Sequence, residues 1–168
     1  MNKKIVIVLA SNQQNLILAK TIQEELIQQG AEIELIDLVA LDLPMFTPDQ
    51  EKKHGIPALI QGQLKILLSA HGFFVVSPEY NGGVPPVLTS WLAWVSRSSA
   101  NWRDAFYGKG AALACHSGGG GAQVLPALRL QWSYLGVNVV GRPISVTADK
   151  PLQASTLRAV ATQLLKLI

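Results

Sequence analysis

The feature that most constrains the fold is the repeated alternation of strand-like apolar runs with amphipathic helical segments along the chain. Residues 4–10 read KIVIVLA, an apolar run without alternation that is typical of a strand buried on both faces of a parallel sheet. After a polar break, Leu18, Ile22 and Leu26 recur at helical spacing before Gly30, which predicts an amphipathic helix that ends at a glycine. Asn15 is a candidate cap for this helix.

The same order of strand and helix continues to the end of the chain. Further strands are predicted at residues 31–38, 72–77, 110–115 and within 137–146, and helices near 58–70, 86–97, 125–135 and 157–168. A long connection containing Pro44, Pro48 and Pro57 follows the second strand. Five strands that alternate with five helices predict an α/β fold with three layers, because right-handed crossovers place helices on both faces of the sheet. No repeat or linker divides the chain, so residues 1–168 are predicted to form a single domain.

Composition and charge narrow the classes of function. Apolar residues make up 49% and charged residues 15% of the chain, which favours a packed domain over a disordered one. The net charge of +3 comes from scattered Lys and Arg residues, so nucleic-acid binding is not indicated. The apolar stretch near the start is too short for a signal peptide or a membrane span. With Cys115 as its single cysteine, we expect a cytoplasmic protein without membrane insertion.

The loops after the first, third and fourth strands form the candidate site, because ligands bind beyond the carboxyl ends of strands in an open parallel sheet. The first loop, ASNQQN, leads into a helix N-terminus, where free N–H groups attract a phosphate. Ser11 and Asn15 either add side-chain donors there or only cap the helix. The loop has neither the glycines of a dinucleotide fingerprint nor the lysine of a P-loop, which weakens both of those predictions.

The other two loops are rich in glycine. The third-strand loop, SPEYNGGVPP, holds a fixed backbone that can hydrogen-bond the edge of a planar ring, with Tyr80 as a flank; the alternative is a tight turn that only delivers a helix. The fourth-strand loop, HSGGGGA, either lets the backbone approach a ring or is merely flexible. Ser117 lacks the preceding glycine of a nucleophile elbow, so hydrolysis is rejected. His54, His71 and His116 share no metal-ligand spacing and are interpreted as surface or structural residues.

One motif identifies a family resemblance. Residues 78–82, PEYNG, with Pro85, Leu88 and Trp94 after them, resemble the characteristic loop and helix of the NADPH-dependent FMN reductase family, which includes quinone, chromate and azo-dye reductases. The resemblance covers nearly the whole chain and is supported by residues 42–44, 108–109 and 117–121. It implies a flavodoxin-like three-layer α/β/α sandwich whose five-stranded parallel sheet has the order 2-1-3-4-5.

The resemblance implies that the protein binds FMN and passes a hydride from NADPH or NADH, through the flavin, to a quinone-like or other small-molecule electron acceptor. No catalytic side chain is implied, because the flavin performs the redox chemistry. The first loop is shorter than the family's and lacks its arginine, so a charge-assisted contact to the phosphate is missing. The implied cofactor-binding residues are Ser11, Asn12, Gln13, Asn15, Pro78, Glu79, Tyr80, Asn81, Gly82, Ser117, Gly118, Gly119 and Gly120.

Two other functions stay open. The first is a flavodoxin-type electron carrier, although flavodoxins are typically acidic and this chain is mildly basic. The second is a family member that has lost flavin and serves as a binding module, which the shortened first loop favours. The resemblance also implies a homodimer or homotetramer, with Trp91, Trp94, Trp102 and Phe106 near a subunit boundary. Alternatively, these aromatic residues fill the core beneath the helix predicted at residues 86–97.

Overall fold

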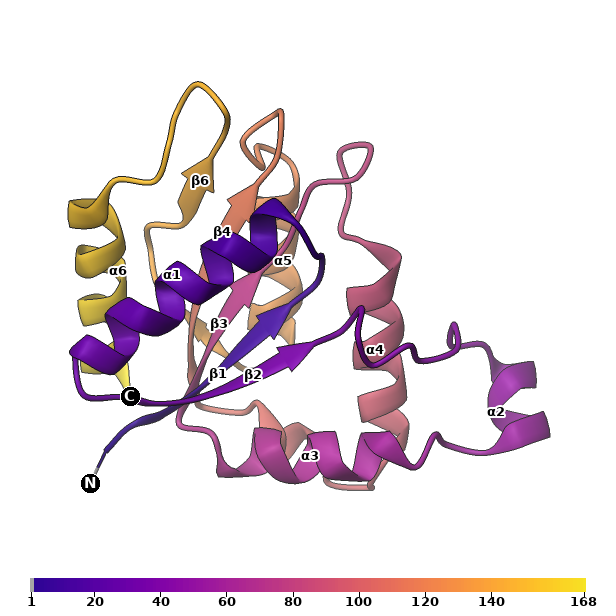
Figure 1. Ribbon diagram of the computed structural model, residues 1–168. Helices are drawn as coiled ribbons and strands as arrows, with labels where there is room; N and C mark the ends of the chain where they lie inside the picture. The colour runs from indigo at the N-terminus through magenta and orange to yellow at the C-terminus, as the bar shows by residue number, and fades with distance from the viewer. Residues whose placement is uncertain (1) are drawn as a thin grey trace.

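The computed structural model describes residues 2–168, and its strands form one parallel sheet (Figure 1). The strands are β1 (Lys4–Leu9), β2 (Glu32–Asp37), β3 (Gly72–Val76), β4 (Gly110–His116), β5 (Asn138–Val139) and β6 (Ile144–Val146). The helices are α1 (Gln14–Gln28), α2 (Pro48–His54), α3 (Leu59–Ser69), α4 (Pro86–Arg97), α5 (Val124–Tyr134) and α6 (Ala154–Leu167), with a short 3₁₀ helix, η1 (Trp102–Ala105). The strand order is β2-β1-β3-β4-β5, which confirms the predicted 2-1-3-4-5 order, and β6 also pairs with β4.

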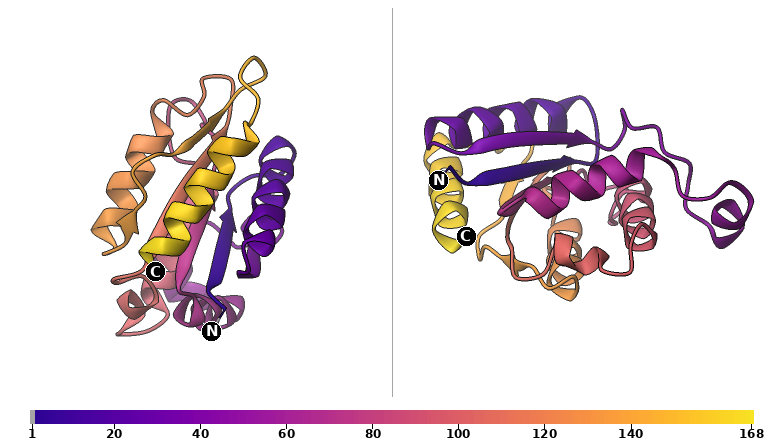
Figure 2. Two further views of the ribbon diagram at one scale, coloured as in Figure 1. Left: turned by 90° about the vertical axis from the view of Figure 1, so that its left-hand side faces the viewer. Right: turned by 90° about the horizontal axis from the view of Figure 1, so that it is seen from below.

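Helices cover both faces of the sheet, as the continuous apolar strands predict (Figure 2). Along each strand, successive side chains point to opposite faces, so Phe74 packs toward α1 and α6 while Phe73 packs toward α3, α4 and α5. The same alternation divides β4, where Ala114 faces α1 and α6 and Cys115 faces the other side. Two apolar layers therefore sandwich the sheet and hold the carboxyl ends of β1, β3 and β4 side by side.

The fifth strand predicted within residues 137–146 is present as two short strands, β5 and β6. Asn138–Val139 pairs with the start of β4 and Ile144–Val146 pairs with its end, and Gly141, Arg142 and Pro143 interrupt them. Pro143 has no N–H to donate to a ladder, which explains the break. The Arg129 guanidinium on α5 donates to the carbonyls of Val139, Val140 and Gly141 at 3.2, 2.7 and 3.0 Å, and so partners the oxygens next to the interruption.

A further helix lies where only a connection was predicted. Thr47 caps α2 by accepting a hydrogen bond from the Gln50 N–H, and Pro48 occupies its first turn. No residue of α2 is buried, so the helix has no apolar face that periodicity would reveal. Every helix within residues 2–168 falls short of the length and apolar character needed to cross a membrane.

Three of the four aromatic residues assigned to a subunit boundary are part of the core. Trp91, Trp94 and Phe106 are 1% exposed or less within a single copy of the chain, and only Trp102 is half-buried. Phe106 packs against Phe73, with 5.8 Å between ring centroids, as part of the layer under α3, α4 and α5. The core-filling alternative is therefore confirmed for these three residues, and the predicted homodimer or homotetramer needs other surfaces.

Candidate functional site

Three loops converge on one pocket at the carboxyl end of the sheet. They are the loops after β1, β3 and β4, which Figure 1 shows at the same end of the molecule. The pocket has a volume of about 320 Å³ and opens to solvent. It is lined by Ser11, Asn12, Gln13, Gln14, Asn15, Pro78, Glu79, Tyr80, His116, Ser117 and Gly118. Nine of the thirteen predicted residues lie in this lining, and the others, Asn81, Gly82, Gly119 and Gly120, lie in the same loops beyond it.

The first loop leads into α1, and no side chain at the cap position hydrogen-bonds the first N–H groups of this helix. Gln13, at the cap position, has φ of 54°, and its side chain makes no capping hydrogen bond to the helix. The first N–H groups of an α-helix have no partner within the helix, so they can bind an anion here. Ser11 is 7% exposed, and its hydroxyl lies 3.3 Å from the Asn12 carbonyl and 3.4 Å from the Tyr80 hydroxyl.

The predicted capping role of Asn15 is wrong. Asn15 lies inside the first turn of α1 and is 4% exposed. Its side-chain Nδ2 donates to the His116 carbonyl at 3.0 Å, and the His116 N–H donates to Asn15 Oδ1 at 3.0 Å. The Asn15 amide thus extends the hydrogen bonding of β4 and fastens it to α1. The Asn15 Oδ1 and one of its two Nδ2–H groups are engaged in this pair, so Asn15 shapes the pocket in which it lies.

The third-strand loop contains a tight hairpin. Tyr80 and Gly83 exchange backbone hydrogen bonds, with N···O distances of 3.2 and 2.9 Å. Asn81 and Gly82 between them have φ of 49° and 74°, as an Asn-Gly turn with two left-handed residues requires. The turn places Tyr80, which is 52% exposed, at the mouth of the pocket and leaves Asn81 and Gly82 at the tip. A planar ligand would therefore contact the rigid base of this loop.

The Glu79 carboxylate caps the N-terminus of α5. Its Oε2 accepts hydrogen bonds from the backbone N–H groups of Gln123 and Val124 at 2.8 and 3.0 Å, at the N-terminus of α5. A carboxylate at that position satisfies two free donors and interacts favourably with the helix dipole. A Cβ at Gly119 would lie 3.1 Å from Glu79 Oε1, so the glycine makes room for this contact. Glu79 thereby joins the third-strand loop to the start of α5.

The backbone path of the fourth-strand loop requires glycine at one position. Gly121 has φ of 78°, and a Cβ there would lie 2.8 Å from the Cβ of Cys115. Gly118 is different, because a Cβ there would meet no atom within 4 Å, so its backbone is bare toward the pocket. Burial raises the pKa of the Cys115 thiol, and Glu79 adds to this effect while a hydrogen bond to Ser117 opposes it. The thiol is therefore a buried, unreactive neighbour of the site.

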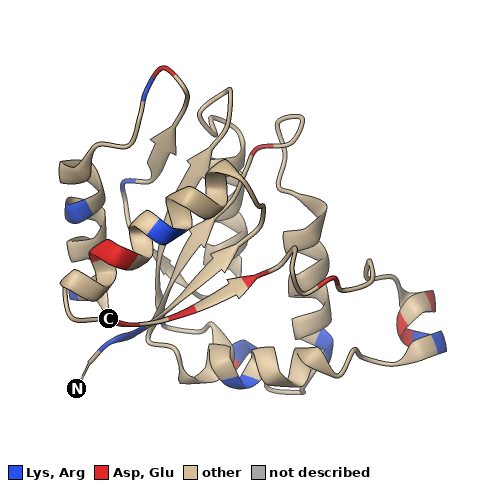
Figure 3. Ribbon diagram, in the orientation of Figure 1, with Lys and Arg blue, Asp and Glu red and all other residues tan. Residues whose placement is uncertain are grey.

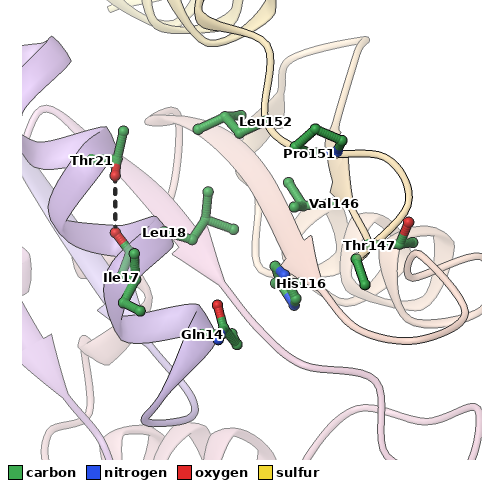
Figure 4. Close-up of a pocket in the computed structure, with 10 residues that line it drawn as sticks. Gln14, Ile17, Leu18, Thr21, His116, Val146, Thr147, Pro151 and Leu152 are labelled. Carbon is green, nitrogen blue, oxygen red and sulfur yellow. Dashed lines mark hydrogen bonds between the residues drawn. The ribbon is translucent and has the colours of Figure 1, made fainter.

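Two residues in the pocket were not predicted from the sequence, Gln14 and His116. Both also line a neighbouring pocket of about 270 Å³ between α1, β6 and the loop that follows β6 (Figure 4). Gln14 belongs to the first loop and begins α1, so that loop already indicated its position. Strand alternation was the available signal, since His116 follows Ala112 and Ala114 on the face that packs against α1.

The groups that line the pocket fit a flavin mononucleotide. Free N–H groups and the Ser11 hydroxyl suit a phosphate at one end. The bare Gly118 backbone and the rigid base of the Tyr80 loop suit a flat ring at the other end. The one carboxylate in the lining, Glu79, accepts two N–H bonds at the N-terminus of α5, where the helix dipole offsets part of its charge.

Comparison with known proteins agrees with this geometry. The Mycoplasma pneumoniae protein named "Uncharacterized protein MG342 homolog" is 29% identical over 145 residues, which cover 84% of this chain and 86% of that protein. An Escherichia coli (strain K12) quinone reductase is 34% identical over 56 residues, only 33% of this chain and 30% of the reductase. The solved structure of FerB from Paracoccus denitrificans, a flavoenzyme NAD(P)H:(acceptor) oxidoreductase, has a TM-score of 0.74 at 19% identity, covering 99% of this chain and 95% of FerB.

The likeness in structure confirms the flavodoxin-like fold. The profile of the family described as NADPH-dependent FMN reductase matches residues 3–150, which include all three loops of the pocket. The chain therefore belongs to the NADPH-dependent FMN reductase family.

Proposed function

We propose that the protein is an FMN-dependent NAD(P)H oxidoreductase that delivers electrons to a quinone-like or other small acceptor. Family membership makes it an oxidoreductase with a flavin cofactor and a nicotinamide co-substrate. The observation that carries the proposal is the convergence of the three predicted loops on one pocket with a helix N-terminus at one end and bare glycine backbone at the other.

The residues of the pocket act by binding and orienting. The N–H groups of the first turn of α1 and the Ser11 hydroxyl hold the phosphate, and the backbone of Pro78, Glu79 and Gly118 lines the ring. When bound, FMN supplies the redox chemistry, taking a hydride from NADPH or NADH and passing it to the acceptor. Tyr80, at the mouth, flanks the ring and limits the access of water.

No side chain of the pocket is assigned to proton transfer. Glu79 is bound to α5, and burial raises the pKa of the nearby Cys115 thiol. The acceptor is expected to approach past Tyr80, because a second hollow of about 310 Å³ adjoins this side chain and is lined largely by apolar residues, among them Leu38, Leu43 and Val87. An aromatic carbonyl compound suits such a lining.

The test is a visible spectrum of the purified protein with added FMN, followed by NADPH or NADH without oxygen. Flavin bands that shift on binding and bleach on addition of nicotinamide are expected, and repeated turnover with a quinone completes the assignment. Binding without bleaching, together with reduction by a partner protein, would instead indicate an electron carrier. No binding at tens of micromolar FMN would leave the binding-module alternative and sink the proposal.

The predicted homo-oligomer is tested separately. We propose a dimer or tetramer, and sedimentation at micromolar concentration checks it. A monomer at that concentration would contradict the proposal. A cytoplasmic location remains a prediction that fractionation of cells would test.

A further inference from the structure

The pocket has an unusual charge balance for a site that holds a phosphate. Its lining residues include no Lys or Arg, and Figure 3 shows these residues elsewhere on the fold. Glu79 is the only carboxylate in the lining, and it is bound to the N-terminus of α5. Among the lining residues, His116 alone can carry a positive charge. A dianionic phosphate therefore has one candidate partner with a full opposite charge.

The position of His116 suits that role. It is the last residue of β4, it is half-buried, and it lines both the flavin pocket and the neighbouring pocket beside α1. Figure 4 shows its ring between Gln14, in the first turn of α1, and Val146 of β6. The ring thus lies beside the helix N-terminus at which the phosphate is expected to bind.

The backbone of His116 is held firmly. The Asn15 side chain bonds both its N–H and its carbonyl, so the imidazole is carried on a fixed main chain. With the main chain fixed, only the side-chain torsions of the imidazole have to be ordered when it binds an anion. Because Asn15 contacts only the main chain of His116, a change of the His116 side chain leaves this clamp intact.

We propose that the protonated imidazole of His116 binds the phosphate of FMN beside the first turn of α1 and makes this protein selective for FMN over riboflavin. The inference rests on the proposed function and adds to it a residue that binds the cofactor. Its consequence is that selectivity for the phosphorylated flavin weakens as the pH rises above neutrality, because a neutral imidazole loses the charge-assisted bond.

The surroundings of His116 leave the phosphate as its partner. The lining residues from α1 are Gln14, Ile17, Leu18 and Thr21, and those from β6 and the following loop are Val146, Thr147, Ala148, Pro151 and Leu152, so neither set is charged. Asp149 and Lys150 in that loop are exposed and line neither pocket. From the third-strand loop come Tyr80, which lies at the mouth of the pocket, and Glu79, whose Oε2 accepts two N–H bonds from the start of α5.

The test compares the affinities of FMN and riboflavin, measured by quenching of flavin fluorescence, for the wild type and His116→Gln. At about pH 7, His116→Gln is expected to weaken FMN binding about tenfold and leave riboflavin binding within about twofold. At about pH 9, where an imidazole is neutral and the phosphate is still a dianion, the two proteins should differ less than about threefold. His54→Gln, a matched change at an exposed residue of α2, should have no effect.

A second variant separates charge from shape. His116→Lys should restore FMN affinity at both pH values, because lysine stays protonated up to about pH 10. If His116→Gln leaves the ratio of FMN to riboflavin affinity unchanged, His116 does not bind the phosphate, although the protein is still a flavoprotein. If the wild type binds neither flavin, the proposed function and this inference both fail. The wild type's own ratio between about pH 7 and 9 needs no variant, and a constant ratio also overturns the inference.

Discussion

Asn15 and His116 exchange two hydrogen bonds of 3.0 Å each, one from the Asn15 amide to the His116 carbonyl and one from the His116 N–H to the Asn15 oxygen. The pair lies 101 residues apart in sequence and joins α1 to the end of β4. The Asn15 side chain is nearly fully buried, and its removal leaves the backbone N–H and carbonyl of the half-buried His116 without these partners.

We therefore expect Asn15→Ala to lower the free energy of unfolding by about 2–3 kcal/mol, as urea denaturation would measure. Asn138→Ala is the matched control, since Asn138 is exposed and its side chain makes one hydrogen bond of 3.3 Å to Gly108. That variant should lose less than about 0.5 kcal/mol. Equal losses for the two variants would show that the reciprocal pair adds no stability.

The contact of Glu79 with α5 predicts a graded effect on stability. Glu79→Ala removes the acceptor for the Gln123 and Val124 N–H groups and should cost about 1–2 kcal/mol. Glu79→Gln keeps an oxygen acceptor but loses the interaction of the charge with the helix dipole, and should cost about 0.5–1 kcal/mol. Urea denaturation measures both, with Glu32→Ala on the exposed side of β2 as a control. A Glu79→Ala variant as stable as the wild type would rule out the cap.

The glycines of the fourth-strand loop predict a separation of folding from binding. Gly121→Ala places a Cβ 2.8 Å from the Cβ of Cys115 at φ of 78°, so we expect a loss of about 2–4 kcal/mol in stability. Gly118→Ala meets no atom within 4 Å, so its stability should change by less than about 0.5 kcal/mol. The added methyl group would however stand where the ring binds, and FMN affinity should fall about tenfold.

Thermal unfolding and FMN titration of the two glycine variants, run side by side, check this separation. Two observations would contradict it. One is a Gly118→Ala variant that binds FMN like the wild type, and the other is a Gly121→Ala variant with wild-type stability.

Lys109 predicts a pH dependence of stability. Its Nζ donates to the carbonyls of Leu67 and Leu68 at 2.6 and 3.1 Å, near the end of α3. Burial lowers the pKa of Lys109 from 10.5 to about 8. Between about pH 8 and 10 the unfolded chain therefore binds more protons than the folded one, and raising the pH favours the folded state.

Relative to Lys109→Met, the wild type should gain stability as the pH rises from about 8 to 10 and show no such trend below about pH 8. Urea denaturation of both proteins at a series of pH values measures the difference. Lys20→Met, at an exposed position of α1, should run parallel to the wild type. Parallel curves for Lys109→Met would contradict the lowered pKa.

Much of the architecture follows from local patterns. The strands β1 and β3 are buried on both faces, so their continuous apolar runs predict them although the runs do not alternate. The PEYNG motif identifies its loop directly. The loops could be assigned to one end of the sheet because parallel strands put their carboxyl ends together. The fifth strand was harder, since residues 137–146 are apolar enough for a strand and only Pro143 indicates where pairing breaks.

The roles of single side chains were less predictable. Asn15 sits at a capping position in the sequence, but its partner is a strand residue that only the fold brings near. His116 was interpreted as a structural residue because it has no metal-ligand spacing, and its place in the pocket depends on the packing of β4 against α1. Thr47 and Pro48 did carry a local signal for α2, which the apolar pattern could not show because α2 buries nothing.

The attachment of Glu79 to α5 has a consequence for motion. An outward movement of the third-strand loop that carries the Glu79 carboxylate away from α5 would break both bonds to the Gln123 and Val124 amides and expose these N–H groups to water. Deuterium uptake at those two amides would then report each opening of the loop in the free protein. A cofactor bound against the loop would slow deuterium uptake at the start of α5 without contacting the helix. The uptake at these two amides would therefore report whether the cofactor is bound.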